Sequence, residues 1–410
     1  MKKYSFLILA LAAVLCACNN NGNEVKEPVV LRLNQQQQQM LQVTNDFSFD
    51  LLREVKAKEN KANIVLSPLS ASFALGMVMN GADGNTLKEM QTALGFNEEY
   101  AIEDINEYYR KLISNLPYLD KTNTLKIANS IWAQNGFPFY DSFIKTNKEW
   151  FSSKVENVDF TNKKTADKIN RWAADNTNNL IKEVVSADEI ADAVMVLANA
   201  LYFKGIWKEK FNKDNTRPFD FTTARGNTIQ TPMMQQTHSF KYAETEEGQL
   251  LEMDYKEEKY TMDILLPAKE QSLDKLTASM TSEKWQEWME KMQYCQVRVR
   301  LPKLETRYEV ELKEALKATG IVDAFTPAAD FSKMSEQDLF INRVKQLCYL
   351  KIDEEGTEAA AVTVVGMKNS AVEYEEPKIY DFFVDRPYLM VIREKNYGTI
   401  LFTAAIGDPG

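Results

Sequence analysis

Apolar side chains recur at helical spacing in the first part of the chain. Between residues 47 and 55 they fall at positions i, i+2, i+4, i+5 and i+8, which predicts an amphipathic helix. We expect this helix to run over residues 40–58, with the five glutamines 35–39 as its exposed first turn.

A second stretch, residues 70–79, is apolar on nearly every side and therefore predicts a helix buried all round. Ser67 is expected to cap this helix and Pro68 to occupy its first turn. Residues 86–89 (Thr-Leu-Lys-Glu) have the spacing of a capping box, which predicts the start of another helix.

Strand patterns dominate the second half. Residues 194–203 are apolar on both faces, as a central strand should be. Residues 260–267 and 297–302 alternate or end at proline, and 389–392 with 399–406 predict a hairpin. Helices followed by strands, with no regular βα alternation, favour an α+β fold.

The most unusual pattern lies at residues 352–363, where small side chains without proline alternate in twos. One face would contain Thr357, Ala359, Ala361, Thr363, Val365 and Met367. Such alternation is typical of a half-buried strand. The flanks, Glu354-Glu355-Gly356 and Lys368-Asn369-Ser370, are instead typical of an exposed loop. The pattern predicts a segment that changes state.

Composition limits the function classes. The chain has 410 residues, 44% of them hydrophobic, enough for a large core. No repeat or second linker interrupts residues 36–410, so we predict a single domain there. A net charge of −10 and the lack of any dense Lys/Arg run argue against a nucleic-acid partner.

The N-terminus predicts export. A basic start and an apolar run too short for a good membrane span indicate a signal peptide over residues 1–17. Leu-Cys-Ala-Cys at 15–18 resembles a bacterial lipobox, with Cys18 as the lipidated residue and 18–35 as a lipid-anchored linker. The alternative is plain secretion. We expect a lipoprotein of the cell envelope, at the outer membrane or cell surface, which contacts the membrane only through its lipid.

The remaining chemistry does not favour an enzyme. His238 is the only histidine, in a polar, turn-like context, and no nucleophile elbow, phosphate loop or metal-ligand cluster is present. We expect no cofactor and no metal. Cys295 and Cys348 lie far apart in apolar runs, which favours buried free thiols over a disulfide.

Four segments, in this order, resemble those of the serpin family. They are 63–70 with 81–86, 199–207, 352–361 and 383–390, and the resemblance covers nearly the whole chain from about residue 40. It implies a serpin fold, in which a helix-rich N-terminal half packs on large mixed sheets with an exposed reactive-centre loop, here at about 356–380. Three departures stand out: Tyr388 where Phe is usual, Gln346 where His is frequent, and Asn178-Asn179 where Gly is common.

The resemblance implies an inhibitor of serine proteases, and of some cysteine proteases, that acts by being cut. The protease forms an acyl-enzyme with the loop, and the freed loop then enters the main sheet as an extra strand and traps it. The hinge of this loop would comprise Glu355, Gly356, Thr357, Glu358, Ala359, Ala360 and Ala361. Family positions around the opening sheet match Ser67, Ser70, Asn199 and Trp207.

The bond that the protease cuts is left open. Lys368 is the only basic residue between Gly356 and Lys378 and favours a trypsin-like target. The resemblance implies Ser370, by the family's usual spacing from the hinge, and the neighbours Met367 and Asn369 remain candidates, so elastase- or subtilisin-like targets also fit.

Other partners are not expected. The acidic stretch 97–107 lies near where some serpins bind polyanions, and Arg110 and Lys111 alone make no such site. We expect a monomer. The alternative function is that of a non-inhibitory serpin that binds or carries a ligand.

Overall fold

The computed structural model describes residues 28–97, 99–357 and 378–410. The α-helices of these residues are α1 (Gln35–Lys58), α2 (Pro68–Met79), α3 (Gly84–Ala93), α4 (Ile102–Asn115), α5 (Asp141–Phe151), α6 (Lys164–Asn176), α7 (Ala187–Ile190), α8 (Leu273–Ser279), α9 (Ser282–Glu290) and α10 (Lys313–Ala318). Among the described helices, none has a stretch both long and apolar enough to cross a bilayer.

The largest sheet has the strand order β1-β15-β14-β8-β7-β6-β9-β13, with β5 paired to β6. Its strands are β1 (Asn63–Leu66), β5 (Arg217–Thr222), β6 (Thr228–Thr245), β7 (Gly248–Asp254), β8 (Tyr260–Pro267), β9 (Gln293–Pro302), β13 (Ile379–Phe383), β14 (Tyr388–Glu394) and β15 (Ile400–Ile406). Every residue of β8, β14 and β15 is buried, so these strands form the centre of the core.

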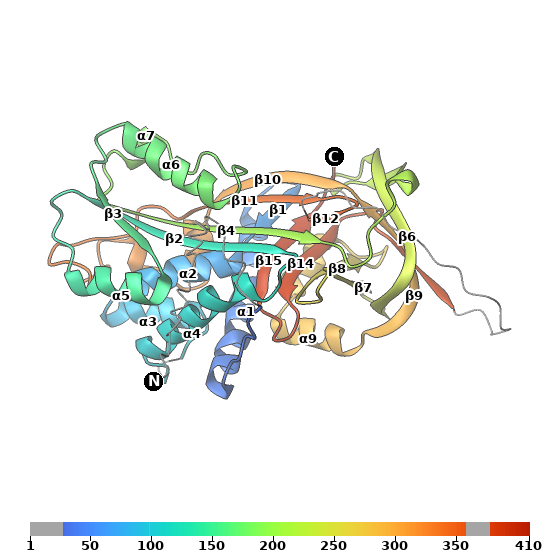
Figure 1. Cartoon of the computed structure of the whole chain (residues 1–410), viewed down its shortest axis with the longest axis horizontal. Helices are drawn as coiled ribbons and strands as arrows, with labels where there is room; N and C mark the ends of the chain where they lie inside the picture. Colours follow the sequence, from blue (N-terminus) through green and yellow to red (C-terminus); the bar gives the residue numbers. More distant parts are fainter. Residues whose placement is uncertain (1–27, 98, 358–377) are drawn as a thin grey trace, which may run out of the picture.

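The other strands form two smaller sheets. One has the order β12-β4-β2-β3 and the other is the pair β10-β11. Their strands are β2 (Thr124–Gln134), β3 (Lys154–Val158), β4 (Met195–Ile206), β10 (Leu304–Glu311), β11 (Lys345–Ile352) and β12 (Gly356–Thr357). Figure 1 shows β2, β4, β10 and β11 running together along the long axis, with α2 on one side and α6 on the other. The steeper strands β14 and β15 lie beneath them.

The helix predictions hold with two corrections. α1 covers the predicted residues and begins at the glutamine run, behind a capping box between Asn34 and Gln37. α2 has Pro68 in its first turn, but Ser67 makes no capping hydrogen bond. α3 is capped by Asp83 instead of opening at the predicted capping box. Thr86 is buried there and accepts a hydrogen bond from the Asp330 backbone, because tertiary packing uses its hydroxyl.

The predicted α+β class is confirmed. Residues 260–267 form β8, and β14 and β15 form the predicted antiparallel hairpin. The pattern missed β2 in the half where helices were expected, although β2 is the long central partner of β4. In β2 buried and exposed residues alternate only at its start, so the period-2 signal is weak.

Candidate functional site

The segment singled out in the sequence begins in a tight turn at the end of β11. The chain leaves β11 at Ile352, and Asp353 and Gly356 exchange backbone hydrogen bonds of 2.9 and 3.2 Å. β12 then returns antiparallel along the end of β4, where Gly356 pairs with Ile206 and Thr357 with Gly205. This turn therefore places the start of a new strand on the edge of β4.

Trp207 holds the turn in place. Its indole nitrogen donates to the Asp353 carbonyl at 2.9 Å, and its backbone N–H donates to the Glu355 carbonyl at 2.9 Å. The ring stacks on Tyr255, with centroids 4.7 Å apart and planes 9° apart. The Tyr255 hydroxyl forms a 2.7 Å hydrogen bond with that of Thr357. Thr357 consequently points into the core, in the orientation that the alternation predicted for it.

The backbone conformation and the close packing at position 356 require a glycine there. Its φ is 152°, a conformation that side chains rarely adopt. A Cβ there would lie 1.9 Å from the Gly205 carbonyl oxygen. A close approach of two backbones at β12 and β4 thus explains a glycine at this position.

Three ion pairs fix the acidic residues of the turn. Glu354 lies 2.9 Å from Lys303 and accepts a 2.8 Å hydrogen bond from Thr216. Glu355 lies 2.6 Å from Lys210, and Lys213 is 3.2 Å away. The prediction of an exposed flank was wrong here, because Glu354 and Glu355 are only 4% and 7% exposed. Paired lysines make this burial of carboxylates tolerable.

The lysines also shift the acidity of these residues. Burial opposes ionisation of Glu354, but hydrogen bonds led by that from Lys303 outweigh it and lower its pKa. The hydrogen bond from Lys210, helped by Lys213, lowers the pKa of Glu355. Both residues are therefore charged at neutral pH.

The two smaller sheets meet at an unpaired edge. Within the described residues, β4 pairs with β2 and with the short β12, whereas β11 pairs only with β10. Between β4 and β11 lies a narrow cavity of about 10 Å³, room for about one water molecule. Its lining comes from both strands, from Thr357 and from residues 177–181 above. β4 and β11 together thus form one sheet divided by a gap that β12 enters at one end.

The start of α2 contacts both sides of this gap. The Ser67 backbone and the Gln346 side chain of β11 exchange two hydrogen bonds, of 3.0 and 2.9 Å. On the other side, Ser70 hydrogen-bonds to Asn199 of β4, whose amide donates to Asn129 of β2 at 2.5 Å. The Ser67 hydroxyl itself donates to the Leu401 carbonyl at 3.0 Å. The predicted residues Ser67, Ser70 and Asn199 are therefore brought together beneath the gap, about α2.

Several predicted residues lie outside the described part of the chain. They are Cys18, Glu358, Ala359, Ala360, Ala361, Met367, Lys368, Asn369 and Ser370. The predicted signal peptide and most of the predicted linker lie outside it as well.

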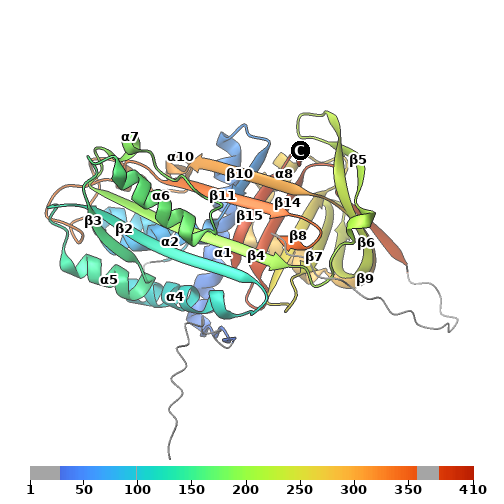
Figure 2. The ribbon, with the colours of Figure 1, turned by 45° about the horizontal axis from the view of Figure 1, so that its top comes forward.

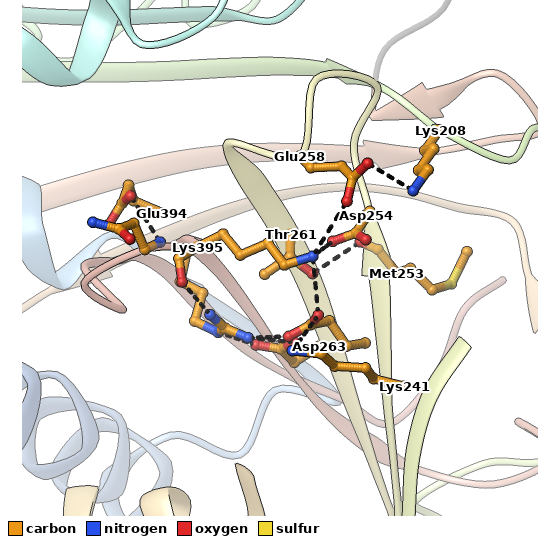
Figure 3. Close-up of polar contacts among 12 residues, drawn as sticks. Lys208, Lys241, Met253, Asp254, Glu258, Thr261, Asp263, Glu394 and Lys395 are labelled. Carbon is orange, nitrogen blue, oxygen red and sulfur yellow. Dashed lines mark hydrogen bonds and ion pairs between the residues drawn. The ribbon is translucent and has the colours of Figure 1, made fainter. Parts of the chain in front are cut away.

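A buried ionic cluster joins β7, β8 and β14 (Figure 3). Arg393 of β14 lies 2.6 Å from Asp263 of β8 and 2.5 Å from Glu252 of β7. Lys395 reaches Glu252 at 3.3 Å and Asp254 at 2.5 Å. Burial raises the pKa of Asp263 to about 6 despite the attraction of Arg393. The cluster fastens three neighbouring strands of the large sheet to one another.

The residues weighed for enzyme chemistry show no catalytic arrangement. His238 lies in the strand β6, so the predicted turn was wrong, and its exposed ring is 3.4 Å from Glu209. Cys348 is buried, Cys295 is partly buried, and both are free thiols. Over the described ranges, no three His, Cys, Asp or Glu side chains could hold a metal ion.

Four residues that hold the turn could not be recognised from the sequence: Tyr255, Lys210, Lys213 and Lys303. All are distant in sequence from residues 353–357, and lysines next to ordinary strand ends give no local signal. Only the fold shows that they converge on the turn.

Comparison with known proteins decides the family. The model of the family "Serpin (serine protease inhibitor)" matches residues 42–409. Human neuroserpin is 34% identical over 377 residues, which cover 89% of this chain and 90% of that protein. Human serpin B3 is 33% identical over 88% of this chain and 97% of its own length.

The chain is a serpin.

Solved structures agree with this assignment. The native state of the thermophilic serpin tengpin superposes with a TM-score of 0.82 at 28% identity, covering 93% of this chain and 97% of that one. Human thyroxine-binding globulin, solved with its ligand, superposes with a TM-score of 0.82 at 27% identity, covering 91% and 99%. The fold of this serpin is therefore shared by relatives with different roles, and its function has to be argued from its own residues.

Proposed function

We propose that this serpin irreversibly inhibits serine proteases by inserting its cleaved reactive segment between β4 and β11. One observation carries the proposal: Gly356 and Thr357 are already paired with β4, at the mouth of the gap. A chain continuing from Thr357 in the same direction would be antiparallel to β4 and would fill that gap. Unpaired backbone groups at a strand edge favour such an addition.

The register supports the residues predicted to enter. Continued from the pair Thr357–Gly205, it would place Ala359 opposite Phe203 and Ala361 opposite Leu201. Phe203 packs on Tyr255, the core residue that also bonds Thr357, so small partners suit this face. Residues opposite one another in an antiparallel pair share a face, and Thr357 points inward. Alanines at these positions therefore suit insertion without steric conflict.

The same register bears on the scissile bond. It would place Met367 opposite Met195, the first residue of β4. Lys368 would then emerge just beyond the sheet, where an attached protease has room outside the fold. We therefore favour cleavage after Lys368 by a trypsin-like protease, with cleavage after Ser370 as the alternative.

A protease panel tests the inhibitor. The protein is mixed with trypsin-, elastase- and subtilisin-like proteases and separated on denaturing gels. We expect an SDS-stable covalent complex with at least one of them, and a released C-terminal peptide that begins at Asn369. A peptide beginning at Ala371 would move the scissile bond to Ser370. Cleavage without any stable complex would refute the inhibitor and favour a role in ligand binding, as thyroxine-binding globulin has.

A matched pair of variants tests the register. Ala361→Glu puts a charge on the face expected to be buried, and desolvation of an unpaired charge costs several kcal/mol. This variant should behave as a substrate, with a much larger number of inhibitor molecules consumed per protease trapped. Ala360→Glu puts the same charge on the opposite face and should retain more inhibition. Equal behaviour of both variants would contradict the register.

The proposal includes a location. The mature protein would be a monomer tethered to the cell envelope by lipid on Cys18, facing its target proteases outside the cytoplasm. Metabolic labelling with a fatty acid tests this: Cys18→Ala should abolish labelling, whereas Cys16→Ala should retain it. Labelling of the Cys18 variant would favour Cys16 or another site.

A further inference from the structure

Residues 177–190 belong to the connection between α6 and β4, and their first part lies over the gap in the sheet. Thr177, Leu180 and Ile181 line the cavity together with Tyr349 and Lys351 of β11. Figure 2 shows α6, the helix before this connection, lying across β2 and β4. We call residues 177–190 the covering segment.

The covering segment is attached firmly to the β4 side. The Asn170 side chain of α6 accepts hydrogen bonds from the backbone N–H groups of Val184 and Val185, at 2.8 and 3.0 Å, and donates to the Val185 carbonyl at 2.8 Å. Ile190 packs in a small apolar cluster with Trp132 of β2. On this side the segment is therefore attached to α6 and to the four-stranded sheet.

Its attachment to the other side is ionic. Glu189 of α7 lies 2.6 Å from Arg343 and 3.6 Å from Lys345, at the start of β11. Arg343 in turn lies 2.8 Å from Glu311, and Lys345 lies 2.8 Å from Glu309, both on β10. The Glu189 carboxylate also accepts the backbone N–H of Ser186 at 2.8 Å, which orients it. These groups join α7 to both strands of the two-stranded sheet.

We propose that Glu189, with Arg343 and Lys345, is an ionic latch that holds the covering segment across the gap and slows strand entry. A strand entering between β4 and β11 has to pass beneath Thr177, Leu180 and Ile181, which line the cavity between these strands. The latch fixes the far end of the same segment to the β11 side, so its release loosens the cover. The inference rests on the proposed insertion, and it assigns to Glu189 control over the rate of that step.

Only part of the latch is exposed to solvent. The Glu189 and Lys345 side chains are 26% and 18% exposed, and that of Arg343 is 47% exposed. The pairs should therefore be weakened, though not abolished, by salt. An ion pair at such a position changes a rate by about twofold to fivefold when it governs the barrier.

Two readouts on the full-length protein test the latch. Hydrogen exchange of peptides over 177–184 reports on the covering segment in the uncut protein. After a single cut in the reactive segment by a non-target protease, the rate at which heat resistance develops reports on insertion. The variants are Glu189→Gln, Arg343→Gln and, as a control, Glu183→Gln, an exposed acid of the same segment.

Glu189→Gln and Arg343→Gln should speed both exchange and insertion, by about twofold to fivefold, and Glu183→Gln should change neither. Salt should speed insertion of the unmodified protein more than that of Glu189→Gln. Unchanged exchange in both latch variants overturns the latch, and faster exchange with unchanged insertion overturns its control of entry. If the cut unmodified protein never gains heat resistance, the proposed function fails, and the exchange data alone decide whether Glu189 holds the segment.

Discussion

The large sheet differs from the divided sheet, our name for the strands β12-β4-β2-β3 and β10-β11 together, in how neighbouring strands are held to one another. β14 is hydrogen-bonded on both edges, to β8 and β15, and all of its residues are buried. In contrast, the facing edges of β4 and β11 have no ladder between them in the described chain, and they are linked only through the short β12 and through hydrogen bonds to the start of α2. Backbone pairing fixes the first region, whereas exchangeable contacts hold the second.

This difference indicates where the molecule can change. An open strand edge is usually a liability, because it invites pairing with another chain. Here β12 occupies one end of the gap, and the covering segment lies over its face. Hydrogen bonds from Ser67 and Ser70 can be exchanged one at a time, whereas the ladder of β14 cannot be opened without breaking the core. Insertion at the divided sheet is thus compatible with an intact large sheet.

The largest effect is expected from breaking the large sheet at Arg393. Arg393→Met leaves Asp263 and Glu252 buried without their main partner, which should lower the free energy of unfolding by about 3 to 5 kcal/mol. The folded-state pKa of Asp263, about 6, lies above its ordinary value of 3.8, so its ionisation lowers stability as pH rises between these values. Without Arg393 the folded-state pKa of Asp263 should rise further, so the pH range over which its ionisation lowers stability should extend to higher pH. Denaturant titrations at pH 5 and pH 8 measure both effects.

Lys208→Met provides the control for Arg393. The pair of Lys208 with Glu258 is exposed, with side chains 41% and 45% accessible. Its loss should cost less than about 1 kcal/mol. A similar loss in both variants, or a loss for Arg393→Met that does not diminish at pH 5, would contradict this account of the cluster.

The next largest effect should arise at Gly356, where the divided sheet begins. Gly356→Ala should cost about 1 to 3 kcal/mol through backbone strain and should detach β12 from β4, since its Cβ would collide with the Gly205 carbonyl. Faster hydrogen exchange at residues 205–207 would show the detachment. Gly136→Ala is the control, because its φ is also positive but its Cβ would meet no atom within 4 Å. Equal exchange at 205–207 in both variants would argue against the collision.

The sequence predicted the strands of the large sheet better than the contacts of the divided one. β14 and β15 are largely apolar because both of their faces are buried, and local pattern suffices for them. Of the small side chains in the predicted hinge, the structure describes Thr357, which points inward as the alternation requires. The anchors could not be found, since Lys303 and Tyr255 reach the turn only through long-range packing. For the same reason Glu354 and Glu355 look exposed in sequence and are buried in the fold.

A smaller effect, and one specific to the divided sheet, is expected from pH. Glu354 and Glu355 have pKa values below their ordinary value of 4.5, because the charged forms are bound by Lys303 and Lys210. Their contribution to the free energy of unfolding is therefore fully present above about pH 4.5 and is lost as pH falls through the lowered pKa values.

Glu354→Gln should cost about 1.5 kcal/mol at pH 7, at the low end for charged hydrogen bonds since Lys303 is half-exposed. The difference between the two proteins, measured as denaturant midpoints, should shrink below pH 4.5. A difference that persists unchanged at pH 3.5 would mean that Glu354 acts through packing and not through its charge. The hinge would then be held to β4 chiefly by Trp207, Tyr255 and the backbone pair at Gly356.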